Sequence, residues 1–345
     1  MDRINLLKTI AVIMVFFLHA SLFDGGNFKA GQLFLENGWT FIFKTPAWAG
    51  CWIFFCISGF LAAKGYLGGK YSTERYSVLQ YYKSKVTKIW VPTIFFWFVC
   101  ILFSYPDFII NNKNVLFQLI SCTYNGNPGL PGIGATWFVF TVMWLYFLTP
   151  LFFILIQFFS KKKKNIVLLI ITLGLGFAYR YYCYKSHLDW YRFVYTIPLA
   201  NIDLYISGML AAFMNYEHEI KSSRLNDYCI ILLVGFVLFN SYTYYSNLMI
   251  HAYMYRFQSI YLLLVFLSLM TIPRGIKNKT ILGKIIDYVA MISFEFYLFH
   301  SLVLYKIAPY VYAKNGTLGY LKLVVITVVI TLFSSLLFKR LAYNK

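Results

Sequence analysis

The sequence predicts an all-α polytopic membrane protein with about ten transmembrane helices and both termini in the cytoplasm. Of the 345 residues, 60% are hydrophobic and only 12% are charged, and the mean hydropathy is +0.65. A soluble domain carries about 25% charged residues, so this chain has too few to cover a soluble surface. The apolar residues gather in runs of the roughly 20 residues that a membrane helix needs, and basic residues lie between the runs.

The apolar runs give the positions of the predicted helices. No internal repeat and no separate soluble domain is expected, so residues 1–345 are interpreted as a single transmembrane domain. The predicted spans cover approximately residues 6–23, 45–67, 89–110, 136–159, 165–184, 198–216, 227–245, 255–272, 285–307 and 320–338.

The basic residues predict the orientation. With the N-terminus in the cytosol, 21 of the 31 Lys and Arg residues fall on the inner side, among them the run KKKK at 161–164. The net charge of +19 is dispersed in short clusters and forms no basic domain, which argues against a nucleic-acid partner. Membrane lipids with anionic headgroups, and the phosphates of a cytosolic substrate, suit this distribution better.

The first span carries two polar residues on one face, Lys8 and His19. Their separation of 11 residues is close to three helical turns, or about 16 Å along the axis. If Lys8 marks the cytosolic interface, His19 lies near the middle of the hydrocarbon layer. An intramembrane histidine either lines a polar crevice or makes one interhelical hydrogen bond, and this helix alone does not decide between the two.

The second span and the basic stretch after it each allow two interpretations. Ser58 and Gly59 leave room for a thin ligand, and equally for another helix backbone. Lys83, Lys85 and Lys88 could hold lipid headgroups or the phosphates of a nucleotide-bearing donor. Sequence spacing does not separate these alternatives.

Two later spans add further candidates. Trp137 opens the fourth span, as part of an aromatic belt or as the wall of a tunnel. In the ninth span Ser293, Tyr297 and His300 occupy one helical stripe, and Glu295 is expected on the other side. The six cysteines show no metal-ligand spacing, so no metal site is expected.

Five segments, taken in order along the chain, resemble the membrane-bound acyltransferase 3 family, which O-acylates surface glycans in bacteria. They are RINLLKTIAVIMVFFLH, FFCISGFL, YYKSKVTKIWVP, TWFVFTVMWLYFLTP and SFEFYLFHS. Two departures from the family pattern stand out. Lys8 replaces the usual arginine, which keeps the charge but loses the bidentate fork, and Val142 and Met143 stand where some members carry an acid.

The resemblance implies an integral O-acyltransferase, most often an O-acetyltransferase, of the bacterial cytoplasmic (inner) membrane. The donor would be cytosolic acyl-CoA, in most cases acetyl-CoA, and the acceptor a hydroxyl of a surface glycan or lipid-linked saccharide. No permanently bound cofactor is expected, and the oligomeric state is left open. His19 would act as general base or would carry the acyl group covalently, supported by His300, Tyr297 or Trp137. The donor would be held by six residues: Lys8, Ser58, Gly59, Lys83, Lys85 and Lys88.

The leading alternative is an exporter or flippase of polysaccharide or lipid-linked sugar that performs no acyl-transfer chemistry. Such a protein would also need about ten spans, a basic interior and aromatic walls. It would typically use several charges within the spans, and few are found there. Consumption of acyl-CoA coupled to ester formation on a glycan would separate the enzyme from the transporter.

Overall fold

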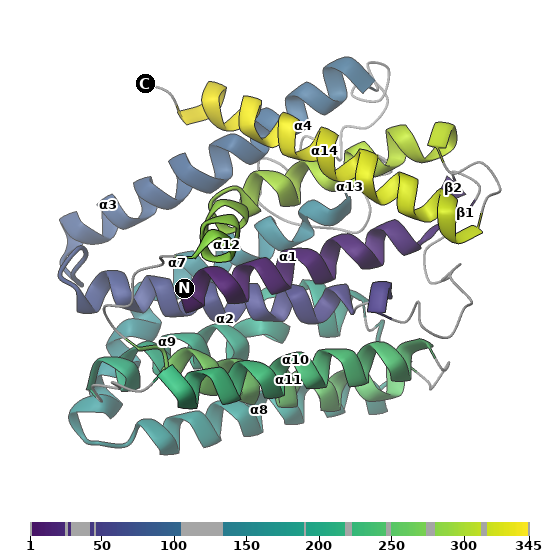
Figure 1. The fold of residues 1–345 in the computed structure, drawn as a ribbon. Helices are drawn as coiled ribbons and strands as arrows, with labels where there is room; N and C mark the ends of the chain where they lie inside the picture. Colours follow the sequence, from purple (N-terminus) through teal and green to yellow (C-terminus); the bar gives the residue numbers. More distant parts are fainter. Residues whose placement is uncertain are drawn as a thin grey trace.

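The computed structural model is built almost entirely of helices (Figure 1). It describes residues 2–24, 27–28, 42–44, 46–104, 134–189, 191–217, 223–245, 250–273, 280–311 and 316–343. Within these ranges the strands are limited to one antiparallel pair, β1 (Phe23–Asp24) and β2 (Asn27–Phe28). The all-α prediction is therefore confirmed, apart from this short hairpin.

Each of the ten predicted spans overlaps a helix. The helices are α1 (Arg3–Ser21), α2 (Ala47–Leu67), α3 (Arg75–Lys85), the π-helical η2 (Val86–Trp90), α4 (Val91–Ser104), η3 (Gly134–Thr136), α7 (Trp137–Lys161), α8 (Asn165–Lys185), η4 (Tyr191–Thr196), η5 (Pro198–Asn201), α9 (Ile202–Glu217), α10 (Ser223–Tyr245), α11 (Ile250–Met270), α12 (Ile281–Met291), α13 (Ser293–Val311) and α14 (Gly316–Tyr343).

Among the described residues, seven helices are long and apolar enough to cross a membrane. They do not include α9 and α13, and α11 contributes only a shorter apolar segment, Phe257–Met270. The protein is thus a multi-pass membrane protein, while ten crossings and the cytoplasmic placement of the termini stay predictions.

Two helices differ from the predicted spans. The helix of the third predicted span begins at Arg75, well before the predicted start at residue 89, and runs through α3 and η2 into α4. Lys83, Lys85 and Lys88 therefore lie on a helix. The predicted span 285–307 is divided at Ile292 into α12 and α13. Since no proline or glycine stands at that break, the sequence carried no local signal for it.

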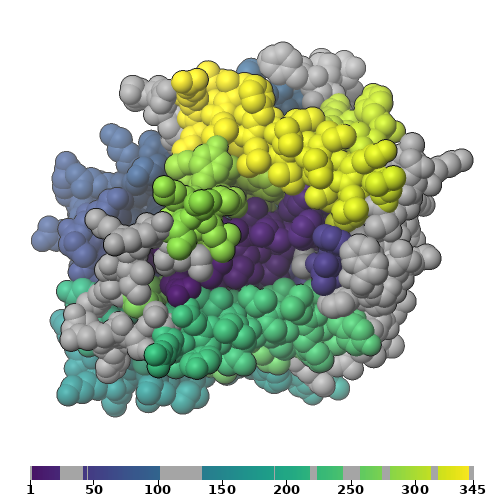
Figure 2. Space-filling model, viewed as in Figure 1, coloured from purple at the N-terminus to yellow at the C-terminus, as the bar shows by residue number. Residues whose placement is uncertain are grey.

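The two chain termini lie at the same end of the bundle, on the left in Figure 1. Arg3 of α1 forms an ion pair with Asp227 of α10. Asn5 donates a hydrogen bond to Asp287 of α12 (2.8 Å), and Lys339 of α14 donates to the Met291 carbonyl (2.9 Å). These contacts gather helix ends from distant parts of the sequence into one polar face, which we call the terminal end. Figure 2 shows the start of α1 (purple) between α12 (yellow-green) and α10 (green).

Helices α2 and α9 cross at a short repeated segment that the sequence-based expectation of no repeat had missed. Residues 57–63 read ISGFLAA and residues 206–212 read ISGMLAA. A Cβ atom on Gly59 would meet the Tyr205 carbonyl oxygen, and one on Gly208 would meet the Cys56 carbonyl oxygen. Only glycine allows the two backbones to approach this closely. The repeat therefore has a packing function at the centre of the bundle.

The outward and inward faces differ in chemistry as a membrane bundle requires. Large apolar side chains point outward, including Leu175 (67% exposed) and Phe333 (68%). The buried guanidinium of Arg180 in α8 pairs with Asp203 in α9 at 2.6 Å, and its second nitrogen donates to Ser259 of α11 at 3.1 Å. A charge buried inside a membrane bundle is tolerated when it is paired in this way.

Replacing Gly59 or Gly208 with Ala should lower the thermal unfolding temperature of the purified protein, because the added methyl group collides with a backbone carbonyl. Overpacking of this kind costs about 1–3 kcal/mol. Gly235→Ala in α10 is the matched control, since a Cβ there has no neighbour within 4 Å. It should leave the midpoint unchanged or raise it slightly. Equal midpoints for all three variants would contradict the close crossing.

Candidate functional site

Helices α1 and α13 meet at a pair of histidines. His19 Nδ1 lies 2.9 Å from His300 Nε2, and the ring centroids are 5.1 Å apart. His300 is only 1% exposed, and its ring stacks on Phe296 with a centroid separation of 6.2 Å. Phe16 of α1 packs against the edge of the same ring. Two residues 281 positions apart thus form one hydrogen-bonded unit.

The contacts of His300 fix which nitrogen atoms carry protons. His300 Nδ1 lies 2.6 Å from the Tyr297 carbonyl oxygen. A carbonyl oxygen only accepts hydrogen bonds, so Nδ1 of His300 is the donor. Apolar surroundings favour the uncharged imidazole, whose Nε2 then accepts from His19 Nδ1–H. It follows that the remaining nitrogen of His19, Nε2, carries a lone pair and no proton.

His19 lies nearer one end of its helix than the sequence suggested. The helix begins five residues before Lys8, and His19 sits in its last turn. At 1.5 Å per residue, His19 is about 24 Å from Arg3 along the axis. The histidine pair is therefore close to the end of α1 that lies opposite the terminal end.

A cavity of about 580 Å³ lies between α1, α2, the α3–η2 helix, α7, α12, α13 and α14. Five charged residues line it: Lys8, Lys85, Lys88, Lys339 and Glu295. Four lysines against one glutamate give the cavity wall a formal excess of positive charge. A concave wall with this balance is suited to an anionic group such as a phosphate.

The rest of the cavity wall is largely apolar and leads toward the histidines. Phe54, Phe138 and Val142 line it together with Ser58. Tyr297 also lines the cavity, three residues before His300 in the same helix. That separation corresponds to a rise of about 4.5 Å. Since neither histidine belongs to the lining residues, the cavity ends about one helical turn short of the pair.

The hydroxyl of Tyr297 is engaged at the inner end of the cavity. It donates to the carbonyl oxygen of Ala135, in the turn η3 that precedes α7. Its ring packs against Phe138, with centroids 5.6 Å apart. Tyr297 therefore separates the cavity from the histidines with its side chain, while its backbone carbonyl holds His300.

Lys85 is held in the cavity wall by aromatic faces. Its Nζ lies 4.0 Å from the ring centroid of Tyr146 and 5.3 Å from that of Tyr81. The Tyr81 hydroxyl in turn donates to Thr149 at 3.0 Å. Cation–π contacts orient an ammonium group while leaving its positive charge in place.

Tyr71, in the loop between α2 and α3, is also affected by the positive charge of nearby lysines. Burial raises the pKa of Tyr71, but a hydrogen bond with Ser84 and the charges of Lys70, Lys85 and Lys88 together hold that pKa below its usual value. An acid is strengthened in this way where positive potential stabilises its anion. The surroundings of these lysines are thus electropositive enough to attract other anions.

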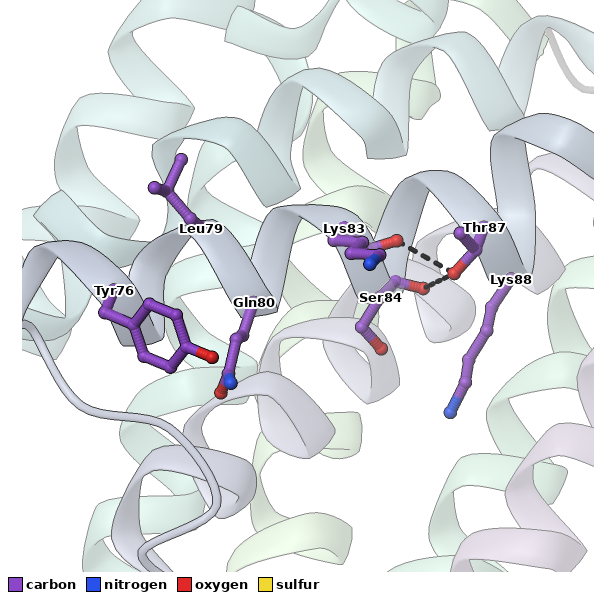
Figure 3. Close-up of a pocket in the computed structure, with 7 residues that line it drawn as sticks. All are labelled: Tyr76, Leu79, Gln80, Lys83, Ser84, Thr87 and Lys88. Carbon is purple, nitrogen blue, oxygen red and sulfur yellow. Dashed lines mark hydrogen bonds between the residues drawn. The ribbon is translucent and has the colours of Figure 1, made fainter.

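Several predicted site residues lie outside the cavity. Gly59 packs against Tyr205 at the α2–α9 crossing. Trp137 is buried and packs on the ring of Tyr195, with centroids 4.3 Å apart. Lys83 lines a separate groove on the outer side of α3, and Lys88 lines both that groove and the cavity (Figure 3). Of the predicted residues, Lys8, Ser58, Lys85, Lys88 and Tyr297 are brought together around the cavity.

Sequence reasoning missed two charged residues of the cavity wall. Glu295 was expected on the side of α13 away from Ser293 and Tyr297, and it lines the cavity together with them. Lys339 belongs to none of the sequence motifs. Its place beside α12, where it donates to Met291, depends on tertiary packing that spacing cannot show.

Comparison with known families gives an independent result. The family model described as the acyltransferase domain, of the acyltransferase 3 type, matches residues 1–339. No curated protein and no solved structure matches the chain. The match extends over nearly the whole chain and includes both histidines and all of the cavity residues.

The hydrogen-bond chain predicts the tautomers of both histidines. In protein labelled with ¹⁵N-histidine, His19 and His300 should each show a protonated Nδ1 and an unprotonated Nε2 at neutral pH. Solid-state ¹⁵N NMR in lipid distinguishes these nitrogen atoms. The chain holds five histidines, so His19→Gln and His300→Gln assign the two signals by removing one each. A protonated Nε2 on His19 would contradict the deduced arrangement.

Proposed function

Because the chain belongs to the acyltransferase 3 family, we propose that it is a membrane O-acyltransferase whose donor is acyl-CoA and whose general base is His19. The observation that carries the proposal is the hydrogen-bond chain from His19 through His300 to the Tyr297 carbonyl. It leaves the Nε2 lone pair of His19 able to accept a proton.

The reaction follows from that lone pair. A hydroxyl oxygen of the acceptor attacks the thioester carbonyl carbon, and His19 Nε2 takes the hydroxyl proton. The C–S bond then breaks, and the thiolate recovers the proton from His19 as the free thiol leaves. The products are an ester and CoA, and the histidine returns to its starting state.

His300 would stabilise the charged intermediate form of His19. Once Nε2 is protonated, the bond from His19 Nδ1–H to His300 Nε2 becomes charge-assisted, which strengthens it. The Tyr297 carbonyl keeps His300 in the tautomer that accepts this bond. His300 is accordingly a positioning residue. The acid of a catalytic triad orients its histidine in a comparable way.

The cavity supports the assignment of acyl-CoA as donor. Its lysines (Lys8, Lys85, Lys88 and Lys339) would bind the phosphates. The apolar wall beyond them, with Ser58 among the aromatic residues, would take the slender arm that carries the thioester. Since the cavity ends at Tyr297, the acyl group reaches His19 only after the Tyr297 side chain moves.

We infer an acceptor that approaches from the side opposite the terminal end. The lysines and the histidine pair are separated along α1 by the distance between Lys8 and His19, about 16 Å. A donor held at one end and an acceptor arriving at the other suits O-acylation, in most cases O-acetylation, of a surface glycan or lipid-linked saccharide at the bacterial inner membrane. An exporter would need no general base between a donor and an acceptor.

His19→Ala should reduce acyl transfer by about 10²–10⁴-fold, the usual contribution of a general base. Mass spectrometry of surface glycans from cells that carry wild type or variant would measure the ester. His187→Ala, in the turn after α8, is the control and should transfer normally. Retained ester with His19→Ala would refute the catalytic role, whereas normal ester with intracellular build-up of unexported glycan would favour the exporter.

Lys85→Ala should weaken CoA binding by about 10-fold to 100-fold, because a hydrogen bond to a charged group is worth about 1.5–3 kcal/mol. Isothermal titration of the purified protein with CoA measures the dissociation constant. Lys161→Ala, at the α7–α8 turn, removes an exposed lysine at a distance from the cavity and should bind as wild type does. If the two variants bind CoA equally well, Lys85 does not hold the donor.

A further inference from the structure

The outer face of the third membrane helix is apolar along α4 and polar and basic along α3 and η2. Arg75–Ser104 forms one continuous helix through α3, η2 and α4, at the edge of the bundle (Figure 1). In α4 the outward side chains are apolar, with Val91, Phe95 and Phe98 exposed by 51%, 43% and 56%. Toward α3 the same face turns polar and basic. An apolar stripe that ends in basic residues matches the change from hydrocarbon to headgroups in a bilayer.

A groove of about 520 Å³ occupies the polar part of this face. Figure 3 shows Gln80, Ser84 and Lys88 following one another along the helix on the same side as Tyr76. Lys83 lines the groove together with Thr87, whose hydroxyl donates to the Lys83 carbonyl at 2.8 Å. The groove thus brings two ammonium groups beside hydroxyl and amide donors.

The structure places the three lysines of this helix in different spaces, a difference that sequence spacing did not show. Lys85 faces inward onto the rings of Tyr146 and Tyr81 and lines the donor cavity. Lys83 lines only the outer groove, and Lys88 stands between the two spaces and lines both. The outer groove therefore has one lysine of its own, Lys83, and shares Lys88 with the cavity.

We propose that the outer groove binds the headgroup of an anionic glycerophospholipid from the leaflet at the terminal end. The lipid phosphate lies between Lys83 and Lys88, headgroup hydroxyls bond Ser84 and Gln80, and the acyl chains follow the apolar face of α4. The groove would match the charged headgroup of the lipid, and the apolar face of α4 would match its acyl chains. A soluble anion would need no apolar face. The site is additional to the proposed acyl transfer and does not depend on it.

The nucleotide of the donor is the competing occupant, because its phosphates have the same charge. Two features favour the lipid. The helix that carries the groove continues into α4, which exposes Val91, Phe95 and Phe98. Lys83 lines the groove and is not among the residues that line the cavity with Lys85. A nucleotide bound to Lys83 would have to lie on the lipid-facing side of the helix.

The test is lipid retention by the purified protein, without donor or acceptor. Protein is reconstituted in nanodiscs that contain equal amounts of phosphatidylglycerol and phosphatidylcholine, and the retained lipids are measured by native mass spectrometry. Wild type should retain phosphatidylglycerol preferentially. Lys83→Gln should reduce this preference about fivefold, the usual effect of one lysine at an anionic surface, and Lys83→Arg should preserve it. Lys161→Gln is the control for an exposed lysine at the same end.

Three results would overturn the proposal. The first is equal retention of the two lipids by wild type, and the second is an unchanged preference in Lys83→Gln. The third comes from CoA titration in phosphatidylcholine nanodiscs, where Lys83→Gln should bind CoA as wild type does. Weaker CoA binding by this variant would assign the groove to the donor nucleotide. Because lipid retention needs no catalysis, a failure here leaves the proposed acyl transfer standing, and a failed transfer assay leaves the lipid site standing.

Discussion

The hydrogen bond between His19 and His300 is the interaction on which the rest of the site depends. Taken alone, each histidine is a costly group in apolar surroundings. Together they satisfy each other's Nδ1 and Nε2 atoms, and the Tyr297 carbonyl satisfies the nitrogen that is left on His300. Nε2 is then unprotonated in both histidines: that of His300 accepts the bond from His19, and that of His19 keeps its lone pair for the reaction. A site with a defined lone pair is thus produced by two helices at opposite ends of the sequence.

The sorting of charge is the second constraint. A cluster of lysines attracts any anion. Charge alone therefore would not distinguish the phosphates of a donor from the phosphate of a lipid headgroup. The π-helical segment Val86–Trp90 follows Lys85 directly, and a π-helical turn shifts the register of the side chains after it. Lys85 faces the aromatic interior, Lys83 faces outward and Lys88 lies between them. The geometry of one helix thereby separates two anion-binding spaces.

The sequence predicted what depends on local patterns. Apolar runs located the helices, and helical periodicity placed Lys8 with His19 and Tyr297 with His300. Periodicity says which residues share a face, but not which helix packs against that face. The contact between His19 and His300 and the place of Lys339 beside α12 were therefore missed. The presence of Glu295 in the cavity wall was missed for the same reason.

Tyr297 shows how one residue can both hold the base and admit the donor. Its carbonyl, which belongs to the backbone of α13, fixes His300, whereas its hydroxyl donates to Ala135 and its ring closes the cavity. Rotation of the Tyr297 side chain would break the hydrogen bond to Ala135. The bond between the Tyr297 carbonyl and His300 would remain, because the backbone carbonyl does not turn with the side chain. A hydrogen bond of this kind contributes a net of about 0.5–1.5 kcal/mol, an amount that donor binding can readily supply. The passage from the cavity to His19 could therefore open while the protons on the two histidines stay where catalysis needs them.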